Sequence, residues 1–189
     1  MASKQSDNSL PQIRSYAAWY GLWLGICWSA SFLLTMAGLT NPFAGNIAFL
    51  VGLLSLPLAV WMLRNFGQLI APLSLTKAWY MAWLMFAAAA LITTAVQYIY
   101  FAYFDDGRLM QAYTDILSQP EQHDLLQKML PGQDIDALID EVLALYSSLS
   151  LSQLTLQCFI WNILLATAMA LPTGLLSFTR RKKDEGTAQ

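Results

Sequence analysis

Four long runs of apolar residues follow one another along the chain, and each is long enough to cross a lipid bilayer. They cover residues 15–37, 44–63, 78–104 and 149–178. A hydrocarbon core of about 30 Å takes about 20 helical residues at 1.5 Å per residue. None of the four runs contains Asp, Glu, Lys, Arg or His. The pattern therefore predicts an all-α membrane protein built on a four-helix transmembrane bundle.

Polar segments separate these runs and set the predicted domain limits. Residues 1–14 form a predicted cytoplasmic tail, 38–43 a short turn, 64–77 a loop at the membrane surface and 179–189 a basic cytoplasmic tail. A secretory signal peptide has only about 7–15 apolar residues before its cleavage site, so the first run is interpreted as an uncleaved span. Pro57 and Pro172 fall inside the second and fourth runs, where we expect proline to bend the helix.

Residues 105–148 show an amphipathic pattern instead of a continuous apolar one. Apolar residues recur at spacings of three and four within 109–117, 125–130 and 135–146, which is typical of short helices with one apolar face. Residues 118–121 match a capping box before the second stretch, and Asp134 precedes the third as a helix cap. We expect three short helices that bury their apolar faces against the outer ends of the bundle or the lipid interface.

Composition and charge support this interpretation and add an orientation. Apolar residues make up 57% of the chain and charged residues 12%, against about 45–50% and about 25% in soluble domains. Arg108 and Lys128 fall in residues 105–148, which hold nine acidic residues, whereas the other eight basic residues lie in the tails and the 64–77 loop. Because Lys and Arg accumulate on the cytoplasmic side of spans, both termini are predicted to be cytoplasmic and residues 105–148 to lie outside.

Small residues recur every four positions in two of the spans. The first row is Ala17, Gly21, Gly25 and Ser29, and the second is Ala166, Ala170 and Gly174. Such rows let helix backbones approach closely in lipid. They indicate either an interface with another membrane protein or a second copy, or packing within the same bundle. The second interpretation is favoured, because every helix of a four-helix bundle already has neighbours.

The polar side chains at membrane depth are Gln97, Gln157 and Asn162, together with Thr93 and Thr94. Amides in hydrocarbon usually hydrogen-bond to another helix, although they could also line a neutral cavity. Ion-coupled transporters and voltage sensors place ionisable groups inside their spans. The four runs contain none, so those two classes are disfavoured.

The chemistry-bearing residues form no recognisable catalytic or metal-binding set. His123 is the only histidine, whereas a zinc site normally needs three or four nitrogen or sulfur ligands. Cys27 and Cys158 lie in apolar runs and have no basic neighbour that would activate a thiolate. There is no Gly-rich phosphate loop or Ser/His/Asp set, and the basic tract at 180–183 fits a stop-transfer anchor. We therefore expect no catalytic residue, cofactor, metal or nucleic-acid partner.

The order of several short motifs resembles a known family. Tyr16 and Gly21 open the first span as Tyr-x-x-x-x-Gly, residues 74–78 (Ser-Leu-Thr-Lys-Ala) begin the third, and residues 97–105 (Gln-Tyr-Ile-Tyr-Phe-Ala-Tyr-Phe-Asp) close it before the acidic segment. This order is similar to the small inner-membrane proteins of Bacteroidota grouped as domain of unknown function 4199, over essentially the whole chain. The resemblance implies a bacterial inner membrane, a periplasmic position for residues 105–148 and a partner in envelope assembly, but no catalytic residue.

These observations favour a non-enzymatic inner-membrane subunit or scaffold, whose partner is a membrane protein or a second copy within the lipid bilayer. The alternative is a small transporter or lipid-handling protein that uses a neutral polar cavity around Gln97, Gln157 and Asn162. An enzyme that uses the outer carboxylates is the least favoured of the three.

Overall fold

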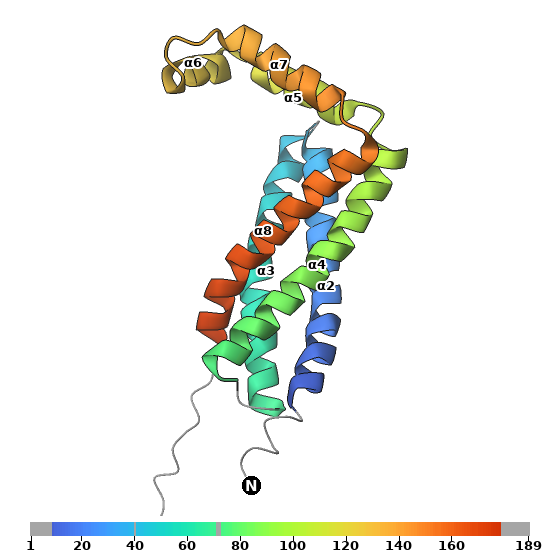
Figure 1. Ribbon diagram of the computed structural model, residues 1–189, viewed down its shortest axis with the longest axis vertical. Helices are drawn as coiled ribbons and strands as arrows, with labels where there is room; N and C mark the ends of the chain where they lie inside the picture. The colour runs from blue at the N-terminus through green and yellow to red at the C-terminus, as the bar shows by residue number, and fades with distance from the viewer. Residues whose placement is uncertain (1–8, 40, 71–72, 179–189) are drawn as a thin grey trace, which may run out of the picture.

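The chain is all-helical in a computed structural model that describes residues 9–39, 41–70 and 73–178, and these residues form seven α-helices and no strand (Figure 1). The four long helices are α2 (Ser9–Gly38), α3 (Pro42–Leu69), α4 (Leu75–Tyr103) and α8 (Leu151–Ser177). Each is long and apolar enough to cross a membrane. The predicted all-α class and the presence of four long apolar helices are confirmed, whereas residues 1–8 and 179–189 of the two predicted tails lie outside the described residues.

The four long helices alternate in direction and form a bundle centred on α4. Helix α2 packs against α3 and α4, α4 packs along α8, and α3 touches α8 over a much shorter stretch. The start of α2 and the end of α8 lie at one end of the bundle, which we call the inner end (Figure 1). Buried alanines, methionines and a phenylalanine of α4 supply much of the core: Ala78, Met81, Ala82, Met85, Phe86, Ala89 and Ala90.

Helix α2 begins earlier than the first predicted span. Residues 9–14 were assigned to a tail, but the helix already includes Ser9. Ile13 and Ala17 are fully buried in the apolar core. Packing against the rest of the bundle therefore keeps the first turns helical, although they are more polar than the turns that follow.

Helix α3 continues to Leu69, so the prediction of a loop over residues 64–77 is wrong for its first half. Phe66 and Gly67 are buried, and Arg64 Nε donates a hydrogen bond to the carbonyl oxygen of Leu176 at 2.9 Å. A long arginine side chain can bury its stem and carry its charge to the surface while the helix continues. Arg64, the first charged residue after the apolar run, therefore does not end helix α3. Helix α3 also passes through Pro57 without interruption.

Three short helices follow α4 and form what we call the outer arm, residues 105–148. They are α5 (Arg108–Leu117), α6 (Pro120–Met129) and α7 (Ile135–Ser147). They lie crosswise over the outer end of the bundle and extend beyond its side (Figure 1). They pack on one another, and none of them packs along a long helix among the residues that the structure describes. The outer ends of the bundle, one of the two expected partners, therefore do not bury their apolar faces.

Local side-chain hydrogen bonds mark the ends of several helices in the outer arm and the start of α8. Before α8, Ser150 and Gln153 form a capping box, with Ser150 N donating to Gln153 Oε1 at 2.8 Å. The capping box predicted for residues 118–121 is wrong, because Ser118 Oγ donates back to the carbonyl oxygen of Thr114 at 2.7 Å and so belongs to the end of α5. The predicted cap at Asp134 is present, since its side chain accepts from Ala137 N at 3.2 Å.

Candidate functional site

The small-residue row of α2 lies against α4 within the same chain. Ala17, Gly21, Gly25 and Ser29 are all buried. A Cβ added to Gly21 would lie 2.6 Å from the Cβ of Ala88, and one added to Gly25 would lie 2.8 Å from the Cβ of Ile92. Both distances are shorter than any stable contact between two non-bonded carbon atoms. The two glycines therefore allow an approach of α2 to α4 that a larger residue would prevent.

The small-residue row of α8 meets α4 from another side. Ala166, Ala170 and Gly174 are buried, and a Cβ added to Gly174 would lie 2.8 Å from the Cα of Trp79. Both rows thus pack inside the bundle, with α4 between them. Both rows contact α4 of the same chain, so other residues form the outer surface of the bundle.

A cluster of polar side chains joins α4 to α8 in the outer half of the bundle. Asn162 Nδ2 donates to Gln97 Oε1 at 2.8 Å and to Thr94 Oγ1 at 3.0 Å. Thr94 Oγ1 in turn donates to the carbonyl oxygen of Ala90 at 2.8 Å. Hydrogen bonds between spans are the usual way to satisfy amides at membrane depth. The structure therefore brings together Gln97 and Asn162, two of the three predicted intramembrane amides.

Gln157, the third of these amides, lies elsewhere. It is exposed on α8, and no hydrogen bond of its side chain occurs within the described part of the chain. Five positions along a helix correspond to a rotation of about 140° once full turns are removed, so Gln157 and Asn162 point in different directions. The prediction that all three amides surround one cavity is therefore wrong for Gln157.

Beside the polar cluster, α3 and α8 separate and leave what we call the lateral cleft, with a volume of about 540 Å³. Helices α2 and α4 form its back wall. The side chains and glycines that line it come from all four long helices: Trp28, Ser31, Phe32, Thr35, Gly45, Ala48, Phe49, Gly52, Leu53, Thr93, Gln97, Asn162, Leu165 and Met169. None of these residues is ionisable at neutral pH, so the lateral cleft is a neutral site with a polar patch.

Ser31 is a member of this wall that the sequence reasoning missed. Its Oγ donates to the carbonyl oxygen of Ala48 at 2.8 Å and so ties α2 to α3 beside the cleft. Thr35, one turn further, also lines the cleft. A Ser and a Thr four residues apart on one helical face were a detectable signal in the sequence, but their short side chains can also bond to their own helix.

The outer arm presents a second candidate surface. Eight large apolar side chains of the arm are exposed, and Met129 is the most exposed of them at 75%. They are Tyr113, Ile116, Leu125, Met129, Leu130, Val142, Leu145 and Tyr146. Ile135 is the buried hydrophobic residue of the arm, at 3% exposure. Contiguous exposed apolar side chains are typical of an interaction site, so the outer arm is a candidate for one.

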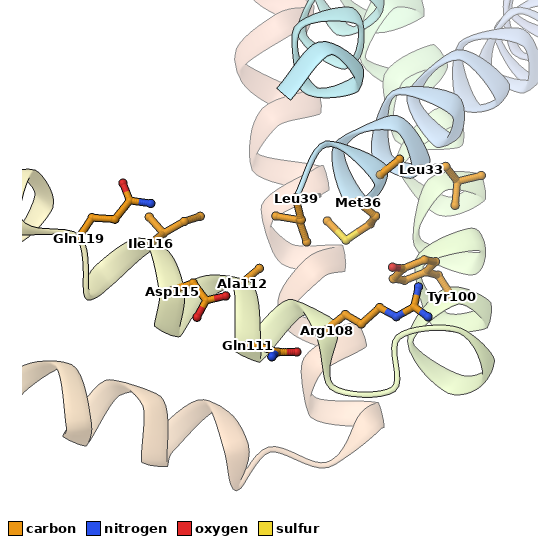
Figure 2. A pocket seen from close by; sticks show the side chains of 11 residues that line it. Leu33, Met36, Leu39, Tyr100, Arg108, Gln111, Ala112, Asp115, Ile116 and Gln119 are labelled. Atoms are coloured by element: carbon orange, nitrogen blue, oxygen red, sulfur yellow. The ribbon is translucent and has the colours of Figure 1, made fainter. Parts of the chain in front are cut away.

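A gap of about 670 Å³ separates the arm from the outer end of α2. Figure 2 shows Ala112 and Ile116 of α5 on the side that faces Met36 and Leu39, with Arg108 extending toward Tyr100. The arm is thus held off the bundle, and it is connected to it only through residues 104–107 and 148–150.

His123 has a partner within the arm. Its Nε2 lies 3.3 Å from Asp136 Oδ1, and the two side chains join α6 to α7 at the surface. Among the residues that the structure describes, no group of three or more His, Cys, Asp and Glu side chains is arranged to hold a metal ion. The contact thus links two helices of the arm and is part of no metal site among the described residues.

Comparison with known proteins identifies a family but no characterised relative. The model of a family described as Protein of unknown function (DUF4199) matches residues 19–177 of the chain. This match covers α4, α8, the outer arm and all but the first turns of the bundle. No curated protein and no solved structure matches the chain significantly.

Proposed function

We propose that this chain, which belongs to the family of proteins of unknown function DUF4199, is a non-enzymatic membrane subunit or scaffold that holds a partner protein with its outer arm. The observation that carries this proposal is the set of eight exposed apolar side chains on an arm that does not pack along the bundle. Burying such side chains gives about 25 cal/mol per Å². A partner that covered them would gain a substantial part of its binding energy there.

The charge of the outer arm favours a partner of a particular kind. Residues 105–148 carry nine acidic and two basic side chains, a formal net charge of −7 with His123 neutral. Two arms of this charge repel each other, and so do an arm and a surface of anionic lipid. A different protein with basic residues around an apolar surface is complementary to the arm. We therefore propose that the partner is a different protein and not the arm of a second copy.

The orientation that goes with this proposal places the arm on the periplasmic side of a bacterial inner membrane. Support comes from the basic residues at the inner end of the bundle, Arg14, Arg64 and Lys77, because Lys and Arg favour the cytoplasmic side. An even number of spans then leaves both termini in the cytoplasm. An envelope-assembly complex is the setting that suits a partner on the periplasmic side.

Introducing a charge among the exposed apolar side chains of the arm tests the proposal. The full chain is purified in mild detergent from the membranes of its host, and proteins that remain bound are identified by mass spectrometry. Leu145→Glu and Met129→Glu place a carboxylate among the exposed apolar side chains. Ser147→Glu and Gln127→Glu add the same charge at exposed polar positions of the same two helices and serve as matched controls.

The expected result is one protein bound at fixed stoichiometry to the wild type and both controls, and lost from both apolar-surface variants. Binding should also weaken as the salt concentration rises, because salt screens the charges around the surface. A chain that purifies without a partner contradicts the proposal. A partner that all four variants retain equally also contradicts it, since binding would then not involve the arm.

The lateral cleft favours the alternative, a lipid-handling protein with a neutral cavity. Transport of an ion is not supported, because no ionisable side chain lines the cleft. A retained lipid in place of a retained protein would favour this alternative over the scaffold.

A further inference from the structure

Most of the lining of the lateral cleft lies in the outer half of the bundle, and Met169 extends it past the middle of α8. The cleft opens sideways, between α3 and α8. On α3 its lining runs from Gly45, one turn after the helix begins at Pro42, to Leu53. These eight steps correspond to about 12 Å along the helix, close to the depth of one leaflet, which is half of a core of about 30 Å. Since α3 and α8 border the opening, a molecule would enter the cleft from the surrounding lipid and not from water.

The wall on the α3 side consists largely of small residues. Gly45, Ala48 and Gly52 line the cleft together with two larger side chains of α3, Phe49 and Leu53. A flexible hydrocarbon chain fits a space of about 540 Å³ with this shape.

Gln97 gives the cleft a polar group that the protein itself does not satisfy fully. Its side chain lines the cleft and is only 8% exposed. Its Oε1 accepts from Asn162, but within the described residues its Nε2 donates to no acceptor. The Oδ1 of Asn162 likewise accepts no hydrogen bond there. Leaving an amide N–H unpaired in apolar surroundings costs about 1–3 kcal/mol, so a ligand in the cleft that accepts from Gln97 Nε2 would be favoured.

The depth of Gln97 matches that of the ester groups of a lipid. Lys77 lies near the start of α4, and Gln97 follows it by twenty residues, which is about 30 Å. If the ammonium group of Lys77 marks the inner boundary of the hydrocarbon core, Gln97 lies at its outer boundary, beside the aromatic residues from Tyr98 to Phe104. The glycerol esters of the outer leaflet lie at the same level.

We propose that the lateral cleft binds one acyl chain of a diacyl lipid from the outer leaflet, and that Gln97 Nε2 donates a hydrogen bond to the ester carbonyl of that chain. Asn162 acts as a positioning residue, because it holds Gln97 by its Oε1 and so directs the amide nitrogen. With no ionisable residue in its lining, the site selects for the ester and not for the charge of the headgroup. The proposal gives the lipid-handling alternative its ligand class and does not depend on a partner of the outer arm.

Competition between an ester lipid and an ether lipid tests this directly. The full chain in mild detergent is titrated with dioleoylphosphatidylcholine and with the ether-linked analogue of the same chain length, and bound lipids are counted by native mass spectrometry. One hydrogen bond is worth about 2- to 12-fold in affinity, so the wild type should prefer the ester lipid by that factor. The preference should persist when the choline headgroup is replaced by ethanolamine.

Three variants separate the hydrogen bond from the fold and from the cleft. Gln97→Leu should bind both lipids with the affinity that the wild type has for the ether lipid, which also shows that it is folded. Gln157→Leu is the matched control, because it removes an exposed amide outside the cleft, and it should keep the ester preference. Gly52→Leu should weaken binding of both lipids, because the added side chain begins 3.3 Å from Ser31 Oγ, at the α2 wall of the cleft, and takes up space in it.

The proposal is overturned if the wild type binds the two lipids equally, if Gln97→Leu keeps the ester preference, or if Gly52→Leu binds both lipids like the wild type. A chain that purifies without lipid and takes up neither probe also overturns it. Transfer of labelled lipid between vesicles is a separate measurement. Ester-selective binding without transfer would contradict the lipid-handling role while leaving the site itself established.

Discussion

The replacement of Gly21 by alanine probes the packing of α2 on α4, on which the bundle depends. The added Cβ would lie 2.6 Å from the Cβ of Ala88 and 2.7 Å from the carbonyl oxygen of Met85. Non-bonded carbon atoms are most stable about 3.5–4.0 Å apart. Helix α2 must therefore move away from α4 by about 1 Å, and neighbouring contacts along the seam are lost with it.

This overpacking should lower the free energy of unfolding by about 1–3 kcal/mol. At about 1.4 kcal/mol per factor of ten, the equilibrium constant of unfolding at a fixed condition should rise roughly 5- to 150-fold. Gly45→Ala is the matched control, because it adds the same methyl group to a helical glycine. Its Cβ would have the Cα of Gly38 as nearest neighbour, at an ordinary 3.7 Å.

Unfolding of the purified chain in mixed micelles with an increasing fraction of SDS, followed by helical circular dichroism, gives the comparison. The transition of Gly21→Ala should shift to a lower SDS fraction, and that of Gly45→Ala should coincide with the wild type to within about 0.5 kcal/mol. If Gly21→Ala also coincides with the wild type, α2 and α4 do not approach as closely as the structure describes, and the reasoning is refuted.

Three further predictions follow from the same structure. Gly174→Ala should destabilise the chain to a similar degree in the SDS titration, because the new Cβ would lie 2.8 Å from the Cα of Trp79, a backbone atom that cannot rotate away; an unchanged midpoint would show that α8 has room there. Gln97→Leu and Asn162→Leu should each cost about 1 kcal/mol, and the double variant less than their sum, since each single change removes a partner of the other amide; additive costs in the double-mutant cycle would contradict the hydrogen bond between them. Ser150→Ala should cost about 0.5–2 kcal/mol by removing the cap of α8, and faster amide exchange in the first turn of α8 would report it, whereas exchange at the wild-type rate would not fit.

The sequence was sufficient to predict the class of the fold and the position of the four spans. Each span shows up in the sequence as some twenty apolar residues in a row. This pattern is strong because burying a charged residue in lipid is costly, so the spans contain none. Their ends were less accurate, because the prediction ended the second span at the first charged residue, Arg64. The structure continues the helix to Leu69, and the arginine side chain reaches the carbonyl oxygen of Leu176.

Which helices lie next to each other could not be read from the sequence. The row that contains Gly21 and the row that contains Gly174 were visible, but both could have served an interface between chains. The closeness of Ala88 and Trp79 assigns both rows to α4. This information is absent from any single span, because it depends on how the helices are arranged around one another.

The candidate sites show the same division between local and long-range information. Gln97 and Asn162 are 65 positions apart, and only the packing of α4 on α8 shows that they meet and that Gln157 does not join them. The lateral cleft exists because α3 and α8 touch over only a short stretch of their length. A pattern of apolar residues predicts which surfaces are buried, but it does not predict where two buried surfaces separate.

The central claim is that the four long helices cross a membrane and leave the outer arm on the side opposite the inner end of the bundle. Single cysteines test it, at the exposed residues Gln122 of α6 and Gln68 near the inner end of α3, in a chain whose Cys27 and Cys158 are replaced by alanine. Labelling uses a membrane-impermeant maleimide on cells with a permeabilised outer membrane. We expect Gln122→Cys to be labelled at once and Gln68→Cys only after lysis. Immediate labelling at both positions, or at Gln68→Cys alone, would contradict it.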